Sequence, residues 1–165
     1  MNWPHLHLMI NHFPVILSAI AAMASLLALV VRRRMVWTFA AVCLALAGLF
    51  AGPVFMTGHE AADSIEDMPR PPKEVIHAHE EAGETAAFIL IGAGIVGAFA
   101  WYRMAKTRGE ESTPPAWIRG AVLVASLAGA GAAGYAALLG GRIYHGQNGN
   151  ARPAAWDSVT TNAPH

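Results

Sequence analysis

The residue type in this sequence with the greatest potential for chemistry is histidine, which occurs eight times. Neutral imidazole binds iron, copper and zinc, and it is a common axial ligand of haem iron. The histidines are His5, His7, His12, His59, His77, His79, His145 and His165. Whether they act together depends on the elements that carry them.

Four apolar stretches, residues 13–31, 35–56, 85–101 and 121–139, are long enough, or nearly so, to cross a hydrocarbon core of roughly 30 Å as helices. The loops after the first and third stretches are basic, and short basic loops stay in the cytoplasm. They carry Arg32, Arg33, Arg34, Arg103, Lys106 and Arg108. We therefore expect an all-α integral membrane four-helix bundle with both termini on the outer, periplasmic side of a bacterial inner membrane. All eight histidines would then face outward.

Composition supports a membrane protein. The chain has 165 residues, of which 55% are apolar and 13% are charged, too few charges for an ordinary soluble domain. We expect one transmembrane domain, residues 1–146, and a polar periplasmic tail, residues 147–165. The net charge is zero, so nothing indicates nucleic acid. Trp37, Trp101, Tyr102 and Trp117 are expected in the aromatic belt at the inner boundary.

The single cysteine, Cys43, falls in the middle of the second stretch and predicts a packing residue. The chain has no C-x-x-C-H motif, so any haem would be held without a covalent bond. The second helix is expected to end near Met56 with Thr57 and Gly58 as its cap, followed by a short surface helix over residues 59–68. Small residues in the last two stretches, among them Gly94, Gly97, Gly131 and Gly134, predict close helix packing, or alternatively room for a flat macrocycle between the helices.

Three helices are expected to bring imidazole to one level near the outer face. His12 lies at the apolar boundary of the first helix, His79 enters the third and His145 leaves the fourth. Such an arrangement suits cofactor binding inside a bundle. His12 and His79 would serve as the two axial ligands of one b-type haem. The paired spacing of a two-haem ladder is absent.

A non-haem site for iron, copper or zinc is the alternative. It would gather three or four ligands from His5, His7, His12 and His79, with Glu80 as a carboxylate ligand or a partner that orients a ring. The H-x-H pair at the start diverges on a helix and converges only on an extended chain.

Several motifs occur together along the chain. They are His5-Leu6-His7-Leu8, Asn11-His12-Phe13-Pro14, Thr57-Gly58-His59-Glu60-Ala61, His79-Glu80-Glu81-Ala82 and Gly140-Gly141-Arg142-Ile143-Tyr144-His145. Over residues 5–146 the chain resembles a group of uncharacterised bacterial four-helix membrane proteins. It is also similar to unknown-function families sometimes fused to Rieske iron–sulfur domains, which implies redox work at the outer face. His59 and His77 stand where the pattern has other polar residues.

The sequence thus predicts a small subunit that carries a b-type haem or a metal at the periplasmic face and transfers electrons within a larger redox complex. Its partners would be other subunits, a quinol or a periplasmic cytochrome. A cofactor-free accessory subunit of a respiratory or photosynthetic complex is the alternative. No nucleophile–base pair or phosphate-binding loop is present, so an independent enzyme is not expected.

Overall fold

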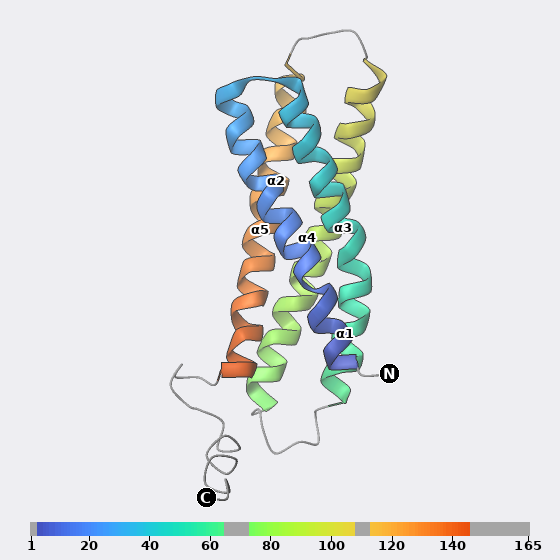
Figure 1. Ribbon diagram of the computed structural model, residues 1–165, viewed down its shortest axis with the longest axis vertical. Helices are drawn as coiled ribbons and strands as arrows, with labels where there is room; N and C mark the ends of the chain where they lie inside the picture. Colours follow the sequence, from blue (N-terminus) through green and yellow to red (C-terminus); the bar gives the residue numbers. More distant parts are fainter. Residues whose placement is uncertain (1–2, 65–72, 108–112, 146–165) are drawn as a thin grey trace, which may run out of the picture.

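The computed structural model describes residues 3–64, 73–107 and 113–145 and folds them into a long helical bundle (Figure 1). These residues form helices and no strand. The elements are α1 (Trp3–Ile10), α2 (His12–Val31), α3 (Arg34–Asp63), α4 (Lys73–Lys106) and α5 (Ala116–His145). The predicted tail, residues 147–165, lies outside the described residues, as does His165.

In the described part of the chain, four helical segments are long and apolar enough to cross a membrane, which confirms the expected number. They are Trp3–Val31, Arg34–Asp63, Lys73–Lys106 and Ala116–Ile143. Large apolar side chains cover much of the outer surface of the bundle. Val30 is 80% exposed, Leu49 69% and Leu138 68%. Such a girdle suits lipid or a neighbouring apolar chain better than water.

The first spanning segment is divided at Asn11 into α1 and α2. Asn11 continues the helical pattern, because its N–H donates to the carbonyl of His7 at 2.9 Å. Pro14 has no N–H to donate to the carbonyl of Ile10, so one helical bond is missing at this point. α1 then lies against α3, as Figure 1 shows.

The expected end of the second helix near Met56 is wrong, because α3 runs on to Asp63. Thr57 and Gly58 therefore lie inside the helix and do not cap it. The helix continues because it still has a face to bury, with Thr57 only 8% exposed and Ala61 only 9%. The expected separate surface helix is wrong over residues 59–63, and residues 65–68 lie outside the described part.

α3 and α4 approach so closely that side chains are excluded between them. A Cβ on Gly94 would lie 2.7 Å from the Cα of Gly48, and one on Gly97 would lie 2.6 Å from the carbonyl oxygen of Ala41. The predicted close packing at Gly94 and Gly97 is confirmed. It is wrong for Gly131 and Gly134, since nothing lies within 4 Å of a Cβ at either position.

The core is built largely of alanine, with Cys43 buried as expected for a packing residue. Trp101, Tyr102 and Trp117 are 49%, 50% and 55% exposed, as belt residues should be. Trp37 is only 1% exposed, so its assignment to the belt is wrong. It fills the space that small neighbours such as Ala24, Ala28 and Ala100 leave between the helices.

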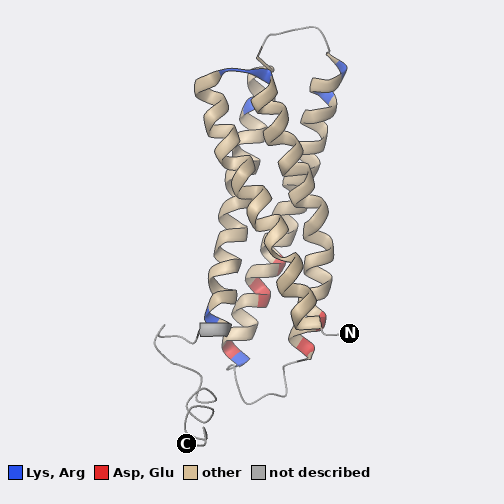
Figure 2. Cartoon of the chain, in the orientation of Figure 1, with Lys and Arg blue, Asp and Glu red and all other residues tan. Residues whose placement is uncertain are grey.

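Charge divides the bundle into two ends (Figure 2). Among the described residues, the end with the α2–α3 connection carries basic residues alone: Arg32, Arg33, Arg34, Arg103, Lys106 and Arg119. The opposite end, called here the acidic end, has six acidic residues among those described, together with Lys73 and Arg142. The acidic residues are Glu60, Asp63, Glu74, Glu80, Glu81 and Glu84. α1 lies at the acidic end, as do the last turns of α3 and α5 and the first turns of α4.

Candidate histidine site

Two histidines from different helices meet within the acidic end. The rings of His7 on α1 and His79 on α4 lie edge to face, with centroids 6.4 Å apart and an angle of 73° between their planes. Both side chains are partly buried. We call this pair, with its contacts on α3 and α5, the histidine site.

The backbone of α5 fixes the tautomer of His79. Its Nδ1 lies 3.0 Å from the carbonyl oxygen of Ala136. A carbonyl only accepts, so Nδ1 carries the proton and donates. In the neutral ring, Nε2 is then left with a lone pair.

The Thr57 hydroxyl fixes the same tautomer in His7, with the proton on Nδ1. The Thr57 hydroxyl donates within α3, where its oxygen lies 3.0 Å from the carbonyl oxygen of Pro53 and 3.1 Å from that of Val54. Its remaining capacity is as an acceptor, and the Nδ1 of His7 lies 3.3 Å from it. The N–H of His7 therefore points to Thr57, and Nε2 again keeps a lone pair.

A glycine makes room for each ring. A Cβ on Gly58 would lie 3.0 Å from the Cε1 of His7, and a Cβ on Gly140 would lie 3.0 Å from the Cε1 of His79. Each imidazole thus rests over a glycine of the neighbouring helix, α3 for His7 and α5 for His79. Four helices therefore build the site, although only two supply its histidines.

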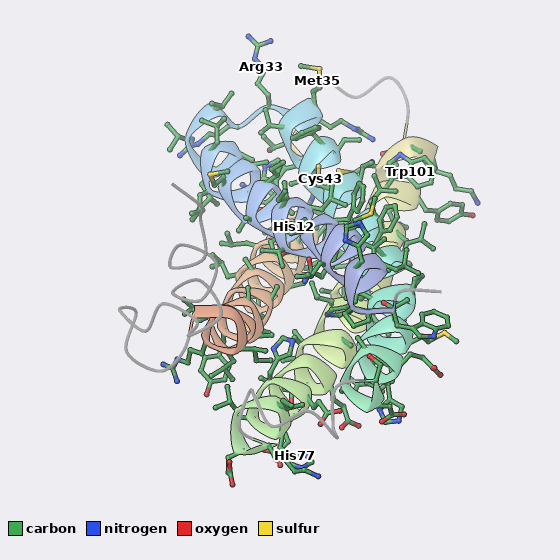
Figure 3. The ribbon with its side chains drawn as sticks, turned by 60° about the horizontal axis from the view of Figure 1, so that its bottom comes forward. His12, Arg33, Met35, Cys43, His77 and Trp101 are labelled. Carbon is green, nitrogen blue, oxygen red and sulfur yellow. The ribbon has the colours of Figure 1, made fainter. Side chains whose placement is uncertain are left out.

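The predicted ligand His12 lies elsewhere. It is exposed, and its Nδ1 is 2.7 Å from the carbonyl oxygen of Leu8 in the preceding turn. Figure 3 shows it on the α1–α2 segment, well away from His77 on α4. His5 is exposed on α1, and His145 is the last residue of α5, with a side chain outside the described part. The structure brings His79 to His7 rather than to His12.

Glu80 lies in a second polar region, a cleft between the ends of α3 and α4. Its carboxylate is 3.2 Å from the Nδ1 of His77. His59, Asp63 and Lys73 line the same cleft. In the described part of the chain, no three or more histidine, cysteine, aspartate or glutamate side chains are grouped so that they could hold a metal ion.

Sequence reasoning missed the pairing of His7 with His79, although it singled out the residues around them. The motifs that contain Thr57, Gly58 and Gly140 come from parts of the chain far apart in sequence. In the structure these three residues contact or support the two imidazoles. The signal that indicates the site is the glycine in each of two motifs. Gly58 packs against His7, and Gly140 packs against His79.

Comparisons with protein-family models, with curated proteins and with solved structures find no match. The resemblance to the uncharacterised four-helix group therefore stays a prediction. The function has to be argued from the histidine site itself.

Proposed function

We propose that this protein is a membrane subunit that holds one b-type haem through His7 and His79 and passes electrons at its acidic end. The observation that carries the proposal is that both imidazole rings have the same tautomer. Each comes from a different helix, each is oriented by a hydrogen bond from Nδ1, and each keeps the Nε2 lone pair. Metal-binding histidines are usually oriented in this way by a carbonyl or another acceptor.

The donor set favours haem over a non-haem ion. Two imidazoles are enough to hold a haem, whereas a non-haem ion would need three or four protein ligands. The histidine site offers two imidazoles, and the described residues group no third ligand with them. Gly58 and Gly140 provide the space that the imidazoles occupy. The residues present therefore supply two imidazole donors, which would hold the haem.

Each part of the site has a definite task in this proposal. When bound, the haem would supply a one-electron couple. The carbonyl of Ala136 and the hydroxyl of Thr57 hold the proton on Nδ1, which keeps each ring in the ligand tautomer. α1, which carries His7, packs mainly on α3.

The charge division supports the proposed orientation in a bacterial inner membrane. The basic end would face the cytoplasm under the positive-inside rule, and the acidic end with the histidine site would face the periplasm. There the protein would exchange electrons with a quinol, a periplasmic cytochrome or other subunits of a redox complex.

Cysteine labelling tests the orientation. Asp63 and Lys106 are exposed near opposite ends, whereas the native Cys43 is buried. In intact spheroplasts an impermeant thiol reagent should label Asp63→Cys and leave Lys106→Cys unlabelled until the membrane is opened. Labelling of Lys106→Cys alone would reverse the orientation and place the histidine site inside.

The reduced-minus-oxidised optical spectrum of the purified protein, with metal analysis, tests the cofactor. We expect a sharp alpha band and about one haem per chain. A colourless protein with stoichiometric iron, copper or zinc would overturn the haem and favour the non-haem site.

A protein with neither haem nor metal would overturn the electron-transfer function. The apolar girdle would then favour the second candidate, a cofactor-free accessory subunit of a respiratory or photosynthetic complex, because exposed side chains such as Leu49 and Val30 would pack on neighbouring subunits.

A further inference from the structure

A shallow cleft lies between α4 and α5. It is lined by three alanines and by a carboxylate, a hydroxyl and a phenol. The lining residues are Ala78, Glu81, Ala82, Thr85, Ala132 and Tyr135. Tyr135 is 60% exposed, so the cleft opens sideways out of the bundle.

The position of the cleft along the helix places it at the outer membrane interface. Glu81 lies about 33 Å along α4 from Arg103, at roughly 1.5 Å per residue, and the hydrocarbon core is roughly 30 Å thick. With Arg103 at the inner boundary, Glu81 reaches the outer headgroup level. Phe88, three residues beyond Thr85, is 65% exposed and extends an apolar surface toward the membrane centre.

The cleft adjoins the histidine site through the backbone. Ala78 and Ala82 flank His79 on α4, and Tyr135 precedes Ala136, whose carbonyl accepts the hydrogen bond from His79. A molecule bound in the cleft would therefore contact residues that lie next to His79 and Ala136 along α4 and α5.

The chemistry of the lining selects a neutral amphiphile that donates hydrogen bonds. Glu81 is the one charged group of the cleft and is an acceptor when ionised, so it repels a phosphate headgroup. Flat alanine surfaces suit a planar ring, and the Tyr135 hydroxyl can bond a ring oxygen. A quinol combines a planar ring, two hydroxyl donors and an apolar tail.

We propose that this cleft binds the headgroup of a membrane quinol, the electron donor to the histidine site. The proposal rests on the proposed function. Oxidation of one quinol to the quinone releases two electrons and two protons. The electron acceptor of the protein, a periplasmic cytochrome or another redox subunit, would take up the two electrons one at a time. Glu81 is placed to accept the first proton, and water at the outer surface the second.

Photolabelling of the purified full-length protein by an azidoquinone tests the site without any turnover. We expect saturable labelling that maps to residues 78–85 or 132–135 and is competed by a short-chain quinol. Glu81→Gln should lower the affinity of the competing quinol about tenfold, since a hydrogen bond to a charged group is lost. Ala132→Trp should block the labelling by filling the cleft, whereas Glu74→Gln, an exposed position outside the cleft, should leave it unchanged.

Labelling that cannot be saturated, or that Ala132→Trp leaves intact in a protein with unchanged gel-filtration behaviour, would overturn the quinol site. Displacement by phosphatidylethanolamine but not by quinol would overturn it in favour of a lipid. The optical spectrum separates this outcome from failure of the proposed function. A protein with haem but without saturable labelling loses only the cleft, and one with saturable labelling but without haem loses the electron-transfer role.

Discussion

Replacement of His79 by alanine should remove the haem from the purified protein, or leave it with a single axial ligand and no sharp alpha band. His7→Ala should do the same, because each ring is one of the two Nε2 donors of the histidine site. The optical spectrum and the haem content of the purified variants measure this effect. We expect a loss of at least tenfold in haem content, in the range found when ligand-supporting groups are removed from metal sites.

His12→Ala is the matched control, since His12 is exposed and bonded within its own segment. It should keep the full spectrum. Added imidazole should restore the spectrum of His79→Ala if the variant is folded and lacks only the ligand. Loss of the alpha band in His12→Ala, with retention in His7→Ala, would contradict the assignment and return the site to the pairing of His12 with His79.

Gly94→Leu should destabilise the bundle strongly, because Gly94 lies in the contact between α3 and α4. A Cβ at Gly94 meets the backbone of Gly48 at 2.7 Å, so α3 and α4 would have to separate. Overpacking of a core costs about 1–3 kcal/mol, and a contact between two backbones has no flexible side chain to move aside. The loss of stability should appear as unfolding at a lower concentration of denaturing detergent. In cells we expect aggregation or proteolysis of the variant.

Gly92→Leu is the control for Gly94→Leu, because it lies two residues away on α4 and a Cβ there has nothing within 4 Å. It should change stability little, since it only adds to the exposed apolar surface. Equal losses in the two variants would show that glycine is needed on α4 for another reason than the contact with α3.

The spanning helices could be predicted because their signal is one of length and composition. A helix satisfies its own backbone in lipid, so about 20 apolar residues are enough to define it. The close contact at Gly94 and Gly97 could be predicted for a similar reason, since small residues permit backbones to approach. Which glycines lie in such a contact could not be predicted. Gly131 and Gly134 occur in a stretch of small residues, as Gly94 does, but they face open space.

The partner of His79 could not be predicted from position along the chain. His12 lies nearer the apolar boundary, and its depth in the membrane alone predicts it as the partner of His79. The face that each histidine presents depends on how the chain continues through Asn11 and on the packing of α1 against α3. These contacts turn His7 toward Thr57 and His79 and leave His12 exposed. The predicted end of α3 is wrong for a related reason. Thr57 and Gly58 are typical of a helix cap, and their buried contacts cannot be seen in the sequence.

The electron paramagnetic resonance spectrum of the oxidised protein tests the central claim, that His7 and His79 together ligate a haem iron. Two imidazole ligands make ferric haem low-spin. We therefore expect a low-spin ferric signal in the unmodified protein, unchanged in His12→Ala and replaced by a high-spin signal or none in His79→Ala. A low-spin signal that survives replacement of both His7 and His79 would contradict the account, as would an oxidised protein with no haem signal at all.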